Sequence, residues 1–190
     1  MLSDYCDNAL TDKNTIHSYI EVYQDLFSCK KESATDVLEV GIGPYMPNGG
    51  SIKMWHDYFT GAQIYALDII SLDRVNPILK GNPRINLYTG TNAYDGEFVK
   101  SMFVNKKFDI VLDDGPHTLE SMITFIKLYG PIVKSDGLLV IEDVQDINWI
   151  DFLTLATSIE DKPFIKVFDR RSIKGRYDDI IFVIDRRNSV

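Results

Sequence analysis

Short apolar runs alternate along the chain with segments in which apolar residues recur every three or four positions. The short runs are rich in Val, Ile, Leu and Phe, which is typical of buried strands. They predict strands over residues 36–40, 63–68, 84–88, 108–113, 137–142, 164–168 and 179–184. The segments with helical spacing predict helices over residues 51–59, 72–80, 93–103, 119–133 and 147–159. This alternation favours an α/β fold with a parallel sheet and helices on both of its faces.

The two ends of the chain depart from this alternation. Only residues 169–178 separate the last two predicted strands, and they lack a helical pattern. A segment of that length suits a hairpin, so we expect the last strand to run antiparallel to its neighbour. Ahead of the first strand, residues 14–27 have helical spacing. The sequence therefore predicts a single domain over residues 1–190, with a Rossmann-like seven-stranded sheet and an N-terminal helical extension.

The composition excludes several classes of partner. The formal net charge is −8 at pH 7, so we expect no binding to the phosphate backbone of nucleic acid. The first residues lack a basic region followed by an apolar run, and no stretch approaches the ~18 apolar residues of a membrane span. The two cysteines, Cys6 and Cys29, cannot form a disulfide framework. We therefore expect a cytoplasmic protein that does not act at a membrane.

Acidic residues recur at the ends of the predicted strands. Ligands of an open parallel sheet bind outside the carboxyl ends of its strands. A single acid at such a position can be a helix cap. Several carboxylates that share one edge repel one another, and they require a cation, a ligand with several hydroxyls, or extensive solvation. Six acids occupy these positions: Glu39, Asp68, Asp113, Asp114, Glu142 and Asp143.

The loop after the first predicted strand begins like a dinucleotide-binding fingerprint. Gly41 and Gly43 have the spacing of its first two glycines, but Met46 stands where the third glycine belongs. A partial match is weak by itself, because tight turns between a strand and a helix often need glycine. Asp68, however, ends the next predicted strand and is well placed to bind a ribose diol. These features predict a cofactor that contains a nucleoside.

Several motifs of the chain resemble one group of enzymes. Leu38-Glu-Val-Gly-Ile-Gly-Pro-Tyr45 and Gly49-Gly-Ser-Ile-Lys-Met-Trp55 resemble class I S-adenosylmethionine (SAM)-dependent methyltransferases. Asp113-Asp-Gly-Pro-His117 resembles the Asp-Asp-Gly-Ser-His motif of the magnesium-dependent sugar O-methyltransferases of macrolide and aminocoumarin biosynthesis, whose relatives include cephalosporin hydroxylase-like proteins. Ile141-Glu-Asp-Val144 resembles the Glu-Asp pair of that group, and Lys174-Gly-Arg-Tyr-Asp-Asp179 resembles a segment near its C-terminus.

This resemblance implies a SAM- and Mg²⁺-dependent O-methyltransferase domain. It implies metal ligands at Asp114, Glu142 and Asp143, and a general base at His117. It implies cofactor contacts at Glu39, Gly41, Tyr45, Ser51, Asp68, Thr91, Asn92 and Asp113. Residues 1–33, with Thr11-Asp-Lys13, His17, Tyr19 and Tyr23, resemble the N-terminal segment that covers the cofactor in the group.

The chain also departs from the pattern of the group. Thr91 and Asn92 stand where the group has Asp-Gln. Pro116 replaces a serine and Pro44 replaces a glycine. These departures affect the expected contacts to the adenine side of the cofactor and leave the metal and base positions intact.

The expected chemistry explains the residue types. Methyl transfer from a sulfonium is an in-line displacement, so an oxygen nucleophile must lie on the methyl axis. Three carboxylates can hold Mg²⁺ with open positions that chelate two neighbouring sugar hydroxyls and lower their pKa. A histidine side chain, with an unperturbed pKa of about 6.5, is mostly neutral at pH 7 and can accept a hydroxyl proton. His117 follows Asp114 by three residues, close enough to serve the same substrate.

Three other functions compete with this interpretation. A short-chain reductase commonly uses Tyr-x-x-x-Lys, and no tyrosine of this chain has a lysine four positions later. A catechol-type O-methyltransferase also uses Mg²⁺, but with a different third ligand and a lysine base. A catalytically silent SAM-binding module would regulate a partner, and intact ligand and base positions argue against it.

The acceptor is not identified by the sequence. A small-molecule or glycan acceptor is expected, with macrolide sugars, nucleotide sugars, lipid-linked glycans and phosphorylated acceptors as candidates. A basic segment lies between the last two predicted strands and either is a solvated loop or meets an anionic acceptor such as a nucleotide sugar. It contains Arg170, Arg171, Lys174 and Arg176. A homo-oligomer is compatible with the sequence.

Overall fold

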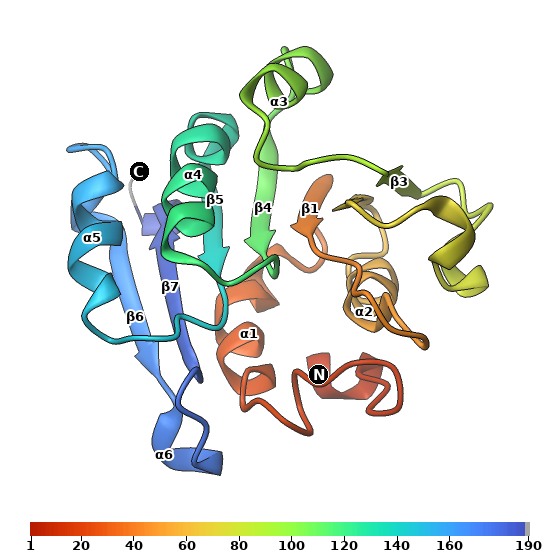
Figure 1. The fold of residues 1–190 in the computed structure, drawn as a ribbon, viewed down its shortest axis with the longest axis horizontal. Coiled ribbons are helices and arrows are strands. Elements are labelled where there is room, and N and C mark those ends of the chain that lie inside the picture. The colour runs from red at the N-terminus through yellow and green to blue at the C-terminus, as the bar shows by residue number, and fades with distance from the viewer. Residues whose placement is uncertain (189–190) are drawn as a thin grey trace. The chain divides into compact units, whose positions relative to one another are not determined.

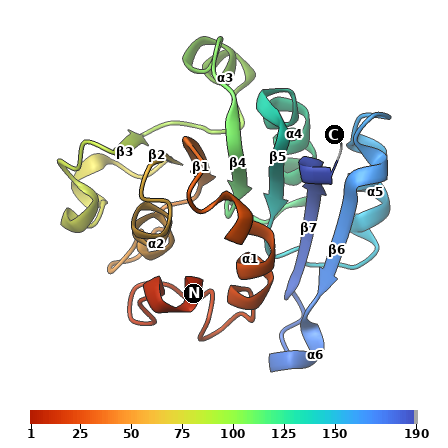
Figure 2. The ribbon, with the colours of Figure 1, turned by 180° about the vertical axis from the view of Figure 1, so that it is seen from behind.

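The computed structural model describes residues 1–188 and consists of two compact units, one from Met1 to Ala93 and one that begins at Tyr94. Figure 1 labels the α-helices and most of the strands, and Figure 2 also labels β2. The sequence predicts a single domain over residues 1–190, and this boundary stays a prediction. Each unit is described by itself below.

The first unit contains three parallel strands in the order β3-β2-β1. Its α-helices and strands are α1 (Ile20–Phe27), β1 (Asp36–Val40), α2 (Gly50–Tyr58), β2 (Gln63–Asp68) and β3 (Ile85–Thr89). Short 3₁₀ turns occupy Leu2–Tyr5, Ser28–Lys30, Leu72–Arg74 and Pro77–Leu79. Because α2 connects two parallel neighbours, β1, α2 and β2 form the βαβ unit that the sequence predicts.

An aromatic cluster forms the core between α1 and α2. The ring centroid of Trp55 lies 5.4 Å from those of both Tyr23 and Phe27, and 6.3 Å from that of Phe59. All four side chains are buried. Burial of one such aromatic side chain contributes roughly 2–3 kcal/mol, so this cluster holds α1 and α2 together. Tyr23, which the resemblance places in a cofactor-covering segment, therefore has a packing role.

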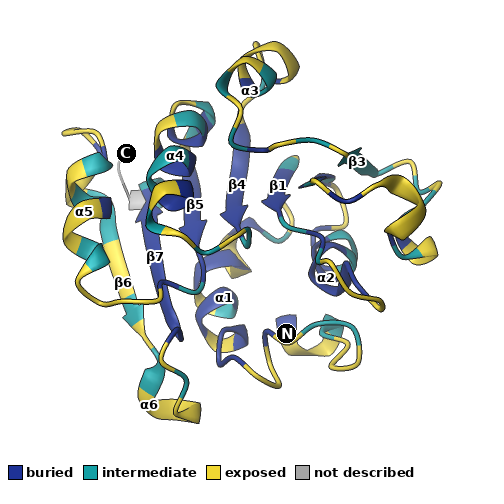
Figure 3. Ribbon diagram, viewed as in Figure 1, coloured by how far each residue is buried: buried dark blue, intermediate teal, exposed yellow. Residues whose placement is uncertain are grey.

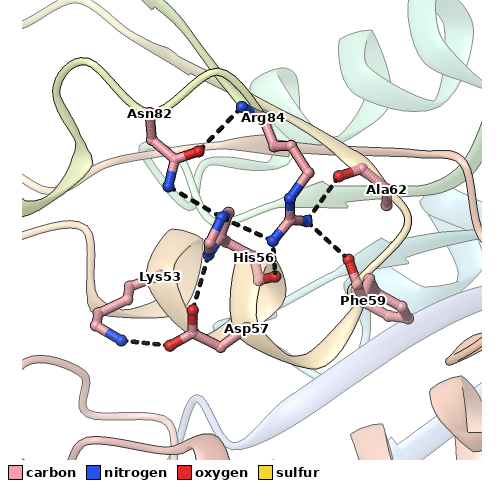
Figure 4. A network of polar contacts seen from close by, with 7 residues as sticks. All are labelled: Lys53, His56, Asp57, Phe59, Ala62, Asn82 and Arg84. Atoms are coloured by element: carbon pink, nitrogen blue, oxygen red, sulfur yellow. Dashed lines mark hydrogen bonds and ion pairs between the residues drawn. The ribbon is translucent and has the colours of Figure 1, made fainter.

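A polar network ties the end of α2 to the entry of β3 (Figure 4). Nε2 of His56 lies 2.8 Å from Arg84 and 3.0 Å from the side-chain nitrogen of Asn82. Both neighbours are donors there, so Nε2 accepts and the other ring nitrogen donates to Asp57 over 2.7 Å. Arg84 also donates to the carbonyls of Phe59 and Ala62. His56 is thus part of a structural network.

The second unit contains four strands in the order β4-β5-β7-β6. Its elements are α3 (Gly96–Met102), β4 (Phe108–Asp113), α4 (Leu119–Tyr129), β5 (Val133–Ile141), α5 (Trp149–Ala156), β6 (Ile165–Asp169), α6 (Arg171–Lys174) and β7 (Ile180–Asp185). Short 3₁₀ turns occupy Gly130–Ile132, Lys162–Phe164 and Arg186–Asn188. Strands β4 and β5 are parallel, whereas β7 is antiparallel to both β5 and β6. Figure 2 shows β6 and β7 side by side, with α6 in their connection.

The strands of the second unit differ in their burial. Every residue of β4 and β7 is buried, which explains why their sequences are mostly apolar. Strand β6 lies at the end of the strand order and is half-buried or exposed along its length (Figure 3). The expected seven-stranded, mostly parallel fold with an antiparallel last strand is confirmed.

The secondary structure predicted for three segments is wrong in part. Residues 72–80 form two 3₁₀ turns and no α-helix, because Asn76 precedes Pro77 and caps the second turn through its side chain. The connection at residues 169–178, for which no helix is predicted, contains the single turn of α6, which ends at Gly175 with a φ of 69°. The predicted helix at residues 14–27 begins only at Ile20, because the carbonyl of Asp12 accepts from three successive amides in a compact turn.

In residues 1–188 no helix is long and apolar enough to span a membrane.

Candidate active site

The loop after β1 is built around the carboxylate of Asp68. Gly41 and Gly43 have φ values of 107° and 103°, which only glycine adopts readily. One carboxylate oxygen of Asp68 accepts from the amides of Ile42 at 2.7 Å and Gly43 at 3.1 Å. The other accepts from the amide of Ile70 at 3.0 Å. A carboxylate offers about four acceptor directions, so these bonds leave room for one further donor, such as a ribose hydroxyl.

Glu39 is fully buried below this loop. Its carboxylate accepts from Ser51 Oγ at 2.9 Å and from Trp55 Nε1 at 2.7 Å, and lies 3.6 Å from Lys13 Nζ. Glu39 is 0% and Lys13 1% exposed, so this is a buried ion pair whose loss would leave an uncompensated charge. Glu39 and Ser51 thus join β1 to α2, and their expected contacts with a cofactor stay predictions.

The remaining cofactor candidates of the first unit lie on its surface loops. Tyr45 is 83% exposed in the glycine loop. Thr91 follows β3, and its amide donates to the carbonyl of Asp68 at 3.1 Å. Asn92, next to it, is exposed. The amide of Gly41 donates to the carbonyl of Leu67 at 2.9 Å, so backbone hydrogen bonds connect the ends of β1, β2 and β3.

In the second unit, Asp113 ends β4 in a buried position. Its Oδ1 accepts from the hydroxyl of Tyr94 at 2.5 Å. Burial raises the pKa of Asp113 to about 7, and the neighbouring Asp114 carboxylate adds to the rise, while hydrogen bonds from Tyr94 and Gly115 oppose it. Burial and then Asp113 raise the pKa of Tyr94 far above its usual range, so its hydroxyl stays a donor. The sequence gives no signal for Tyr94, because its partner is distant along the chain.

Asp114, His117 and Asp143 converge beside this position. Each offers one ligand atom, and these atoms lie within 4.8 Å of one another. Nε2 of His117 lies 3.7 Å from a carboxylate oxygen of Asp114 and 3.7 Å from one of Asp143. All three side chains are half-buried, so they are accessible to a ligand. Glu142, the third expected metal ligand, is 1% exposed and is not among the grouped residues.

The backbone at this cluster is unusual. Within residues 1–188, His117 (φ 54°) and Asp143 (φ 53°) are the only non-glycine residues with a positive φ. Such a conformation costs on the order of 1 kcal/mol for a residue with a Cβ, and residues that adopt it cluster at functional sites. Sequence patterns do not reveal it, because histidine and aspartate mostly adopt ordinary backbone conformations elsewhere.

The donor set of the cluster fits a hard divalent cation. Two carboxylates supply the oxygen ligands that Mg²⁺ prefers, and that ion is usually held by one or two carboxylates. Asp114 and Asp143 could hold such an ion while His117, from the same cluster, faces a bound acceptor.

The chain is similar in sequence to two curated O-methyltransferases. No protein-family model matches the chain. It is 30% identical over 145 residues to 8-demethyl-8-alpha-L-rhamnosyl tetracenomycin-C 2'-O-methyltransferase of Streptomyces olivaceus, which covers 75% of this chain and 37% of that protein. It is 33% identical over 156 residues to mycinamicin VI 2''-O-methyltransferase of Micromonospora griseorubida, with coverages of 80% and 38%.

A solved methyltransferase structure is also similar to the chain. The MycE methyltransferase from the mycinamycin biosynthetic pathway, in complex with Mg, SAH and mycinamycin VI, has a TM-score of 0.72 and 26% identity, and the match covers 97% of this chain and 53% of that one. The chain thus spans less than two fifths of the length of these curated relatives and about half of the solved chain. The chain has the class I methyltransferase fold and is similar in sequence to O-methyltransferases of tetracenomycin and mycinamicin.

Proposed function

We propose that the chain is a SAM- and Mg²⁺-dependent O-methyltransferase that acts on a sugar hydroxyl of a small molecule. The observation that carries this proposal is the convergence of Asp114, His117 and Asp143, whose ligand atoms lie within 4.8 Å of one another. The curated relatives are O-methyltransferases whose names specify sugar-bearing natural products, and the related MycE structure contains Mg and SAH. These relatives support the reaction, and the carboxylate cluster supports the metal.

The residues of the second unit have distinct roles in this proposal. Asp114 and Asp143 hold the cation, with Glu142 as a further predicted ligand. The bound Mg²⁺ supplies Lewis acidity that lowers the pKa of a coordinated sugar hydroxyl. His117 accepts the hydroxyl proton at Nε2, the ring atom that lies near both carboxylates. That oxygen would displace the sulfonium methyl of bound SAM in line, with SAH as the leaving group.

The residues of the first unit bind the cofactor. Asp68 uses its remaining acceptor direction for a ribose hydroxyl, and Gly41, Tyr45, Thr91 and Asn92 line the loops around it. Glu39 and Ser51 support the glycine loop from below. Asp113, in the second unit, and the N-terminal segment 1–33 are further predicted contacts of the cofactor.

A methyl-transfer assay tests the proposal. The full chain is incubated with SAM, Mg²⁺ and a panel of glycosylated macrolides and nucleotide sugars, and products are searched by mass spectrometry for the gain of one methyl group. Turnover that stops when EDTA is added and returns with excess Mg²⁺ would support the proposal. Full turnover in EDTA would contradict the metal assignment. Binding of S-adenosylhomocysteine (SAH) without turnover on any acceptor would favour a silent SAM-binding module.

A further inference from the structure

The hydroxyl of Tyr94 contacts the strand end that supports the carboxylate cluster. Tyr94 directly precedes Asp95, the N-cap of α3, and its hydroxyl donates to Asp113 Oδ1 at 2.5 Å. Asp113 is 3% exposed, so this bond is shielded from water. A hydrogen bond to a buried carboxylate is stronger than one between neutral groups, and its loss leaves a costly unsatisfied acceptor.

Asp113 is connected to both turns that carry the proposed metal ligands. Its carboxylate also lies beside Gly115, where a Cβ would be 3.0 Å from Asp113 Oδ1, so it contacts the residue on the far side of Asp114. Its backbone carbonyl accepts from the amide of Glu142 at 3.0 Å. Glu142 directly precedes Asp143. One residue therefore links the turn of Asp114 after β4 to the turn of Asp143 after β5.

The position of the Tyr94 hydroxyl explains why residue 115, in the motif Asp113-Asp-Gly-Pro-His117, is glycine. A Cβ at Gly115 would lie 1.9 Å from the Tyr94 hydroxyl oxygen and 3.0 Å from Asp113 Oδ1. The nearest ring carbon, Cζ of Tyr94, would be 3.1 Å away. The hydroxyl is therefore the principal obstacle to a side chain at Gly115, and this turn is shaped around it.

We propose that Tyr94 is a positioning residue of the metal site, which holds Asp114 and Asp143 in place through Asp113. This inference rests on the proposed function, because it assumes that the cluster binds a divalent cation. Groups that orient metal ligands typically change metal affinity by 10–100-fold when they are removed. Tyr94→Phe removes the hydroxyl and keeps the ring, so it isolates this contact.

The role of Tyr94 is tested by titrating the full chain with Mn²⁺ and measuring the free ion by its EPR signal. We expect Tyr94→Phe to weaken Mn²⁺ binding about 10-fold or more and to raise the Mg²⁺ concentration needed for half-maximal turnover, with turnover restored at saturating Mg²⁺. Tyr58→Phe is the matched control, because it also removes a buried tyrosine hydroxyl, but in the first unit. Urea unfolding of both variants measures any general loss of stability. Mn²⁺ affinity within threefold of wild type in Tyr94→Phe would overturn the inference.

A second variant tests the contact independently of stability. Gly115→Ala should lose Mn²⁺ affinity because its Cβ displaces the Tyr94 hydroxyl. The double variant Tyr94→Phe/Gly115→Ala should bind Mn²⁺ more tightly than Gly115→Ala alone, because the closest obstacle is gone. Additive losses in the double variant would contradict the inference. If wild-type protein binds no Mn²⁺ or Mg²⁺ at all, the proposed function itself fails, and this inference fails with it.

Discussion

At the scale of single residues, the candidate site combines charge with an uncommon backbone conformation. His117 and Asp143 both have a positive φ, and both contribute to the same cluster. Aspartate tolerates this conformation because its short side chain bonds locally, whereas most residues with a Cβ pay about 1–2 kcal/mol. The strained backbone of His117 thus occurs at the residue whose side chain, the proposed base, lies near both Asp114 and Asp143. Such a site is organised for function rather than for maximal stability.

Substitutions of His117 separate its backbone role from its chemical role. His117→Asn and His117→Ala should each lower turnover by roughly 10²–10⁴, the usual contribution of a positioned general base. Asparagine adopts a positive φ more easily than alanine does, so we expect His117→Asn to unfold at a higher urea concentration than His117→Ala. Both variants should still bind SAH. If either variant keeps more than about a third of wild-type turnover, His117 is not the base.

Neutral substitutions of the carboxylates test the metal site. Asp114→Asn and Asp143→Asn should each abolish Mg²⁺-dependent turnover and weaken Mn²⁺ binding, because each removes a charged oxygen ligand. Their melting temperatures should equal or slightly exceed that of the wild type, because like charges repel in the absence of a cation. Glu142→Gln should have the same effect on metal binding if its buried carboxylate reaches the ion. Unchanged Mn²⁺ affinity in Asp143→Asn would remove that residue from the ligand set.

At the scale of elements, Asp68 couples the end of β2 to the glycine loop after β1. Asp68→Asn keeps the size of the side chain but replaces one acceptor oxygen by a donor, which cannot accept from the loop amides. We therefore expect a loss of about 1–3 kcal/mol in the free energy of unfolding, measured with urea, and weaker SAH binding by calorimetry. Asp73→Asn, at an exposed acid in the same unit, is the control. If Asp68→Asn behaves like this control, Asp68 neither shapes the loop nor binds the cofactor.

Most elements follow from local patterns, and the exceptions have local causes. Periodicity places β1 and β2 at their observed bounds, because both are short apolar runs between clear breaks. It fails at Asn76-Pro77, where a proline and a side-chain cap favour 3₁₀ turns over a helix. The acids at the strand ends are visible in the sequence, but their grouping is not. The contacts of Tyr94 with Asp113, and the separation of Glu142 from the cluster, depend on packing between segments far apart along the chain.

At the scale of the whole molecule, some acids stabilise the fold and take no part in the proposed chemistry. The candidate carboxylates Asp114 and Asp143 lie near His117, whereas Asp161 and Asp185 form ion pairs with arginine that support the fold. Arg186 donates two hydrogen bonds to Asp161, at 2.6 and 2.7 Å, and also donates to the carbonyls of Gly130 and Val133. A hydrogen bond from Arg186 lowers the pKa of Asp161 against the effect of burial. These pairs join the end of β7 to neighbouring segments of the second unit.

Asp185 predicts how the stability of the chain depends on pH. Burial alone would raise its pKa, but hydrogen bonds from Arg187 and Lys166 outweigh burial and hold the pKa well below its usual range. Because the folded pKa lies below the unfolded value of about 3.9, the stabilisation is complete above that value and is lost as the pH falls towards the folded pKa. We expect Asp185→Asn to cost on the order of 2 kcal/mol at pH 7.

The difference in unfolding free energy between wild type and Asp185→Asn, measured with urea at pH 7 and pH 3, tests this prediction. This difference should be about 1 kcal/mol smaller at pH 3 than at pH 7. At pH 3 the Asp185 carboxyl of the unfolded chain is mostly protonated, while that of the folded chain is still charged. Asp136→Asn, at an exposed acid of β5, controls for the general effect of acid on the chain. A difference that is the same at both pH values would mean that Asp185 stabilises the fold through packing and not through its charge. The two basic partners on β6 and after β7 would then be dispensable, and Lys166→Met should unfold at the wild-type urea concentration.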